Sequence, residues 1–195
     1  HKETESQKEL VLREKISPDA VEKEVNRFSN AVRRTRAQLK KIFNNLQRTM
    51  GKDSALIIET QYLLLKEGNL VNDIRDMITT HSVSTEWAIK EIEKNYIRVF
   101  SNIPDLTFKE RINDISDVLV RILNNLKKTR QEEDADVENA ILVADDIPPS
   151  IAANLLSRGK LLGLVLDNGG ETSHTVILAR TLGIPTILHT HKASR

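Results

Sequence analysis

The stretch that decides the fold of this chain is Leu161-Leu162-Gly163-Leu164-Val165-Leu166-Asp167-Asn168-Gly169-Gly170-Glu171-Thr172-Ser173-His174. Its apolar first half predicts a buried strand, and the paired glycines that follow predict a turn. From His174 to Arg180 the chain is amphipathic, which predicts a helix that ends before Gly183 and Pro185. The stretch therefore predicts a strand, a glycine turn and a helix, a unit typical of α/β proteins.

This turn has the chemical features of a phosphoryl-carrying site. His174 would lie at a helix N-terminus, where backbone N–H groups favour anions. Gly169 and Gly170 let the backbone approach a phosphate, and Thr172 and Ser173 add hydroxyl donors. A neutral imidazole nitrogen can attack phosphorus. The spacing alone is equally compatible with a simpler interpretation, in which Thr172 or Ser173 only caps the helix and His174 is an ordinary surface residue.

The neighbouring segments extend the α/β pattern. Residues 140–144 predict a short buried strand, a Pro-Pro-Ser turn at 148–150 predicts the cap of a short helix, and residues 185–188 predict a further strand. The polar, acidic residues 131–139 predict a linker before this unit.

Upstream of this linker the chain has helical periodicity. An apolar seam from Val21 to Leu46 predicts a helix of roughly eight turns, with Ser17 and Pro18 at its start. Further amphipathic helices are predicted at about 53–66, 70–78 and 84–100, and another after a capping box at 107–110. Because their apolar faces need partners, we expect a bundle or a pair of helical hairpins.

Composition excludes several classes of function. The 29 Lys and Arg residues nearly balance the 28 Asp and Glu residues, and aromatic residues are only 4% of the chain, so we expect no nucleic-acid partner. No apolar run approaches the length of a membrane span, so we expect no membrane insertion. The absence of cysteine excludes disulfides, thiolate metal sites and cysteine nucleophiles, and fits a cytoplasmic protein.

The histidine turn resembles the phosphohistidine signature of the phosphoenolpyruvate-utilising enzymes. The matching positions are Gly169, Gly170, Thr172, Ser173, His174, Ala179, Arg180, Leu182, Gly183, Ile184 and Pro185. Within that family, residues 16–19, 59–64 and 108–117 resemble helices of Enzyme I of the bacterial sugar phosphotransferase system. The resemblance implies an α+β fold. In it, a helical docking subdomain of two hairpins (17–130) is inserted into a small α/β phosphohistidine swivelling subdomain (1–16 plus 135–195).

The resemblance also implies a function. His174 would be phosphorylated from phosphoenolpyruvate by a C-terminal domain outside these residues, and would pass the phosphoryl group to a histidine of the phosphocarrier HPr. That domain would bind Mg²⁺ and form the homodimer. We expect this chain to be a monomeric fragment without a cofactor or metal of its own, unable to use phosphoenolpyruvate alone. The positions that match the HPr-docking surface are Lys52, Asp53, Leu63, Leu64, Glu67, Leu70, Arg111 and Asp114. The leucines are equally compatible with the core of the bundle.

Some positions depart from the family pattern. Gln61 stands where the family usually has histidine, and Lys52 where it often has an acid, which leaves open a nitrogen-regulatory paralogue of Enzyme I with its own HPr-like partner. The chain is also compatible with a swivelling domain of the pyruvate phosphate dikinase or phosphoenolpyruvate synthase type, and with an inactive HPr-binding module. Ala152 stands where a threonine often holds the unphosphorylated histidine, so either Ser150 takes over this role or His174 is less fixed.

Overall fold

The computed structural model describes residues 15–66, 69–100, 106–127, 139–157, 161–168, 170 and 173–194. Five α-helices come first among these residues: α1 (Val21–Met50, preceded by the 3₁₀ turn η1, Pro18–Ala20), α2 (Lys52–Lys66), α3 (Asn69–His81), α4 (Thr85–Phe100) and α5 (Leu106–Lys127). The remaining elements are β1 (Ala140–Ala144), α6 (Pro149–Ser157), β2 (Leu161–Leu166), α7 (His174–Thr181) and β3 (Thr186–Ile187). The predicted fold class, helical hairpins plus a small α/β unit, is confirmed.

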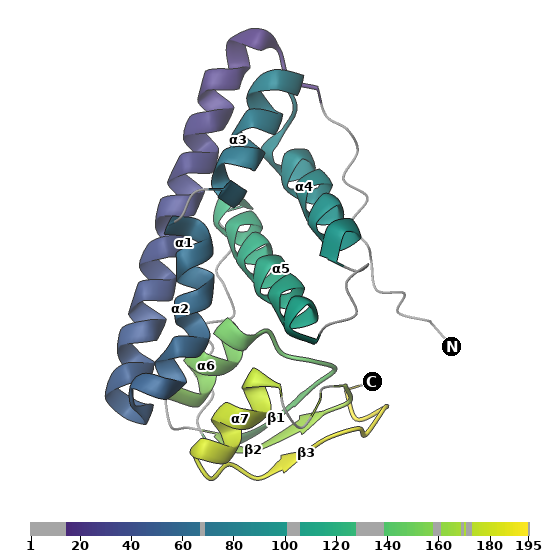
Figure 1. Cartoon of the computed structure of the whole chain (residues 1–195). Coiled ribbons are helices and arrows are strands. Elements are labelled where there is room, and N and C mark those ends of the chain that lie inside the picture. The colour runs from purple at the N-terminus through teal and green to yellow at the C-terminus, as the bar shows by residue number, and fades with distance from the viewer. Residues whose placement is uncertain are drawn as a thin grey trace.

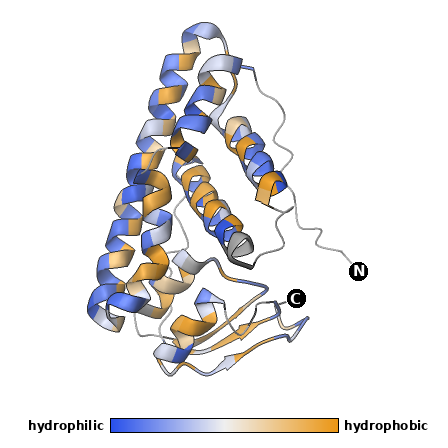
Figure 2. Cartoon of the chain, viewed as in Figure 1, coloured by the Kyte–Doolittle hydropathy of each residue, from blue (hydrophilic) through white to orange (hydrophobic). Residues whose placement is uncertain are grey.

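Helix α1 organises the helical part. It runs the height of the molecule, and α2, α3 and α5 pack along it (Figure 1). Its buried side chains follow the predicted seam, and Figure 2 shows hydrophobic and hydrophilic residues alternating along it, as expected of a helix with one apolar face. Gly51 ends the helix with a φ of 86°, a conformation that favours glycine. The buried residues of α1 are Phe28, Ala31, Val32, Thr35, Leu39, Ile42 and Leu46.

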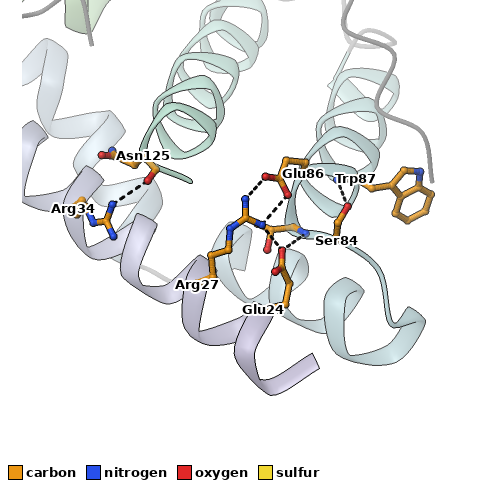
Figure 3. A network of polar contacts seen from close by, with 8 residues as sticks. Glu24, Arg27, Arg34, Ser84, Glu86, Trp87 and Asn125 are labelled. Atoms are coloured by element: carbon orange, nitrogen blue, oxygen red, sulfur yellow. Dashed lines mark hydrogen bonds and ion pairs between the residues drawn. The ribbon is translucent and has the colours of Figure 1, made fainter. Parts of the chain in front are cut away.

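A polar network fixes the start of α4 against α1 (Figure 3). The guanidinium of Arg27 donates to both carboxylate oxygens of Glu86. Glu24 accepts from the Arg27 guanidinium and, at 2.8 Å, from the backbone N–H of Thr85. Glu24 therefore supplies an acceptor for one of the N–H groups that the first turn of α4 leaves without an intrahelical partner.

The described strands form a three-stranded parallel sheet in the order β1-β2-β3. Its connections are helices: α6 links β1 to β2, and α7 links β2 to β3. Leu164 and Leu166 of β2 belong to the same buried cluster as Leu156 of α6 and Leu178 of α7, which gives the sheet one covered face. The predicted strands at 140–144 and 161–166 are present, and the third is shorter than predicted. The prediction that 140–144 is buried is wrong, because successive side chains point to opposite faces of the sheet: Leu142 and Ala144 pack against the core, whereas Ile141 and Val143 are exposed.

Helix α6 joins the two parts of the molecule. It packs against α1, α2 and α5 on one side and against α7 on the other (Figure 1). The predicted subdomain limits stay a prediction, because residues 1–14 and 128–138 lie outside the described ones. None of the helices in the described ranges combines the length and the hydropathy that a membrane span requires.

Candidate functional site

His174 is the first residue of α7 and is half-buried. Ser173 is the N-cap of this helix: its backbone is extended, and its hydroxyl accepts from the N–H of Val176 at 3.4 Å. The N–H of Ser173 in turn donates to the carbonyl of Gly170 at 2.9 Å, which closes the turn. The prediction that a hydroxyl caps the helix is confirmed for Ser173, while Gly169 and Thr172 lie outside the described residues.

Two sets of contacts hold this turn at the carboxyl ends of β1 and β2. Thr175 is buried, and its hydroxyl donates to the carbonyl of Ile147 at 3.1 Å, which ties α7 to the loop before α6. The side-chain amide of Asn168 donates to Asp145 at 2.8 Å, so the ends of both strands are joined. In parallel α/β sheets this end of the strands is where ligands bind.

Asp167, at the end of β2, anchors residues 190–194. Its enclosed carboxylate accepts from the hydroxyls of Ser194 and Thr190 and from the N–H groups of Ala193 and Ser194, at 2.7 and 3.0 Å. The hydrogen bond from the Ser194 hydroxyl, followed by that from Thr190, holds the pKa of Asp167 far below its usual range. Sequence reasoning missed this residue because its partners lie 23 to 27 positions away.

His189 and His191 follow β3 and are exposed. Among the described residues no group of three or more histidine, aspartate or glutamate side chains could hold a metal ion.

A buried polar cluster joins the helical part to α6. Asp117 of α5 accepts from the hydroxyl of Ser150 at 3.0 Å, from the N–H of Ser150 at 3.1 Å and from the amide of Gln61 at 2.9 Å. Arg121, one turn further along α5, donates to the Ser150 hydroxyl at 2.6 Å. Ser150 lies in the first turn of α6, whose N–H groups have no intrahelical partner. The Asp117 carboxylate of α5 accepts from one of these N–H groups.

The contacts of this cluster bear on the role of Ser150. Ala152 is buried in α6, and the hydroxyl of Ser150 contacts Asp117 and Arg121. The interpretation that Ser150 takes over the role of the family's threonine therefore finds no support in these contacts.

Asp114 of α5 lies one turn before Asp117 and is 5% exposed. Burial raises the pKa of its carboxyl, and three influences oppose this shift: the hydrogen bond from Gln61 at 3.3 Å, the charge of His174 and the charge of Arg111. Burial also lowers the pKa of Arg121, and the charge of Asp117 counteracts this.

The positions predicted for partner docking differ in their exposure. Arg111, Lys52 and Asp53 are exposed, and Leu63 and Leu64 are half-buried. Leu70 is only 3% exposed and belongs to the bundle core, which agrees with the alternative that it is a core leucine. Asp114 is buried as well, and Glu67 lies outside the described residues. The docking roles stay a prediction.

Two family descriptions match this chain. Residues 4–111 match the N-terminal region of the PEP-utilising enzymes, and residues 136–195 match the mobile domain of the PEP-utilising enzymes.

Curated relatives agree with this match. The chain is 34% identical over 187 residues to the phosphoenolpyruvate-protein phosphotransferase of Bacillus subtilis (strain 168), covering 95% of this chain and 32% of the relative. It is 34% identical over 197 residues to the protein of that name from Haemophilus influenzae, covering 96% of this chain and 34% of the relative. The chain thus spans about a third of the length of these relatives.

Solved structures share the fold. The solution structure of Enzyme I (nEIt) superposes with a TM-score of 0.77 at 31% identity, covering 93% of this chain and 73% of that one. The N-terminal domain of Enzyme 1 - Nitrogen superposes with a TM-score of 0.66, covering 92% and 72%, and at 24% identity it supports the fold alone.

Proposed function

The chain belongs to the family of PEP-utilising enzymes, and from this premise we propose that it is the phosphoryl-relay part of a phosphoenolpyruvate-protein phosphotransferase. His174 carries the phosphoryl group between phosphoenolpyruvate and a histidine of an HPr-type phosphocarrier. The observation that carries this proposal is the position of His174 at the capped start of α7, beside the carboxyl ends of two parallel strands.

Each step exchanges one bond to phosphorus for another. In loading, a ring nitrogen of His174 forms an N–P bond while the P–O bond of phosphoenolpyruvate breaks and its electrons leave with the enolpyruvate oxygen. In delivery, a ring nitrogen of the partner histidine forms a new N–P bond while the N–P bond at His174 breaks. Neither step needs a covalent contribution from other side chains, so the chain contributes position and charge.

The start of α7 suits the charge of a phosphohistidine. His174 is the first residue of the helix, so its side chain starts at the end where the N–H groups of the first turn and the positive end of the helix dipole favour an anion. The cap by Ser173 and the bond from Thr175 to Ile147 fix the direction in which the helix starts. The imidazole is thereby placed without being fully enclosed, as a group that must meet two partners in turn requires.

In this proposal, the groups that bind phosphoenolpyruvate and metal lie outside these residues. A C-terminal domain of the longer protein supplies phosphoenolpyruvate binding, Mg²⁺ and the homodimer contact, and the relay acts in the cytoplasm. Partner docking involves the exposed Arg111 and the half-buried Leu63 and Leu64. Gln61 in place of the family's histidine favours, as a second candidate, the nitrogen-regulatory branch with its own HPr-like partner.

Labelling tests the proposal. The chain is incubated with phospho-HPr and, separately, with the phosphorylated HPr-like protein of the nitrogen branch, and the bound phosphate is located by mass spectrometry. We expect an acid-labile, base-stable phosphate on His174 and none on the His174→Ala variant. An unlabelled wild type with both donors, or equal label on the variant, would refute the assignment, and the faster donor identifies the branch.

A further inference from the structure

A cavity lies between α1 and α2, the two helices that run side by side along one edge of the molecule (Figure 1). Its volume is about 160 Å³, and the residues that line it are Lys40, Phe43 and Asn44 of α1 and Glu59 and Tyr62 of α2. The lining residues of each helix are three or four positions apart, so each set lies on one face of its helix. The cavity is therefore built by two facing helix surfaces.

The polar groups around this cavity are not engaged by the rest of the described chain. No hydrogen bond or ion pair there involves four of the lining side chains, Lys40, Asn44, Glu59 and Tyr62. The same helix makes such bonds next to the cavity, because Asn45 accepts from Arg48 at 2.7 Å. One helix thus offers an ammonium group and an amide to the cavity, and the other offers a carboxylate and a hydroxyl.

The apolar part of the cavity comes from two aromatic rings. Phe43 and Tyr62 are half-buried and pack against the hydrophobic core, so their positions are fixed. An enclosed apolar cavity of about 150 Å³ is large enough to hold one benzene ring. Lys40 and Asn44 are exposed, so the polar end of the cavity meets water. The space therefore suits a ligand with one apolar ring and a charged end.

We propose that this cavity binds a free α-amino acid with an aromatic side chain. The ligand's carboxylate accepts from the Lys40 ammonium group and the Asn44 amide, and its ammonium group donates to the Glu59 carboxylate. Its ring packs against the rings of Phe43 and Tyr62. Such a ligand has no net charge, which matches the one positive and one negative side chain of the cavity. A ligand with a single charge would leave either Lys40 or Glu59 unmatched.

This site is separate from the proposed phosphoryl relay. Its residues belong to α1 and α2, whereas His174 begins α7. Leu64, one of the positions predicted for partner docking, lies about 200° around α2 from Tyr62, because each helical residue turns the chain by about 100°. The binding of the amino acid therefore does not depend on phosphoryl transfer or on partner docking.

NMR titration of the nitrogen-labelled chain tests the proposal with three probes. Phenylalanine carries both charges, phenethylamine only the ammonium group, and hydrocinnamate only the carboxylate. We expect phenylalanine to shift the amide signals of residues 40–44 and 59–62 with a dissociation constant of about 1 mM, the affinity typical of a ligand of this size. Each single-charge probe should bind about twofold to fivefold more weakly, the effect of one exposed ion pair.

Variants assign the two charges. Lys40→Gln and Glu59→Gln should each weaken phenylalanine by about twofold to fivefold. Lys40→Gln should not weaken phenethylamine, and Glu59→Gln should not weaken hydrocinnamate, because neither probe uses the side chain that is lost. Lys41→Gln is the matched control, because Lys41 is exposed on α1 and does not line the cavity, and it should bind phenylalanine as the wild type does.

A variant that fills the cavity completes the test. Asn44→Trp places a large side chain at an exposed lining position and should abolish the shifts; Asn44→Phe serves if the tryptophan protein fails to fold. A wild type without saturable shifts, equal affinity for the three probes, or unchanged binding by the filled variant would overturn the inference. None of these results bears on the labelling of His174, so the proposed function stands or falls separately.

Discussion

The Asp117 carboxylate should be the strongest single tie between the helices and α6, and its replacement by alanine tests this. Asp117 accepts three hydrogen bonds, two from Ser150 and one from Gln61, and is 7% exposed. Its charge also compensates the buried guanidinium of Arg121. Removing one partner of a buried charged pair typically costs about 3–5 kcal/mol. For a chain of 195 residues each kcal/mol lowers the melting temperature by about 2–4 °C, so we expect a decrease of about 6–20 °C.

The assay is thermal unfolding followed by circular dichroism, supported by urea unfolding at 25 °C. Asp76→Ala is the matched control, because Asp76 is exposed on α3, and its side chain should contribute within about 0.5 kcal/mol. Asp117→Asn keeps an acceptor for Ser150 but loses the charge, so its melting temperature should lie between those of the wild type and the alanine variant. A decrease for Asp117→Ala no larger than that for Asp76→Ala would refute the assignment of this tie.

Further variants probe other parts of the fold. Leu39→Ala removes a fully buried side chain from α1 and should cost about 2–5 kcal/mol in urea unfolding; a cost below about 1 kcal/mol would contradict the packing. The depressed pKa of Asp167 stabilises the fold above the unfolded-state pKa of the carboxyl, and this contribution is lost as the pH falls through the folded-state pKa. Asp167→Asn should therefore be less stable than wild type at pH 7, and the difference in stability should shrink in acid. A difference that stays constant with pH would argue against the pKa shift. The raised pKa of Asp114 has the opposite effect on stability, because its ionised carboxylate destabilises the fold above its unfolded-state pKa. Asp114→Asn should therefore unfold at a higher urea concentration than wild type at pH 7, and a lower urea midpoint would contradict this. Arg27→Met breaks the ion pair with Glu86 at a partly exposed site and should cost no more than about 1 kcal/mol, so a loss of several kcal/mol would show that this network contributes more than its exposure suggests.

The helices and strands could be predicted from the sequence because their signals are local. The seam of α1 repeats every three or four residues, and the strand at 161–166 is a continuous apolar run that two glycines follow. The position of His174 at the start of α7 was predictable for the same reason, since a capping serine and an amphipathic run surround it.

The polar junction could not be predicted in this way. Asp117 lies 56 positions from Gln61 and 33 positions from Ser150, and each of the three residues alone fits an exposed helix face or a turn. Leu70 shows the same limit, because a leucine on an amphipathic helix fits either the core or a docking patch. Only the packing of α6 against α2 and α5 decides which polar residues are enclosed.

The chemistry of this junction differs from that of the bundle, and the difference bears on what each part does. Between the helices the contacts are mainly made by apolar side chains such as Leu39 and Leu119, and the energy of this packing does not depend on the charge of neighbouring groups. Where α5 meets α2 and α6, the enclosed groups include Asp114, Asp117 and Arg121, although well-packed apolar residues in place of buried ions are often neutral or stabilising. A charged junction does what an apolar one cannot, because its energy changes when the charge on a neighbouring group changes. The variants at Asp114 and Asp117 should therefore separate in their effects on unfolding: Asp117→Ala should lower stability, because it removes three hydrogen bonds, whereas Asp114→Asn should raise stability, because it removes a buried charge.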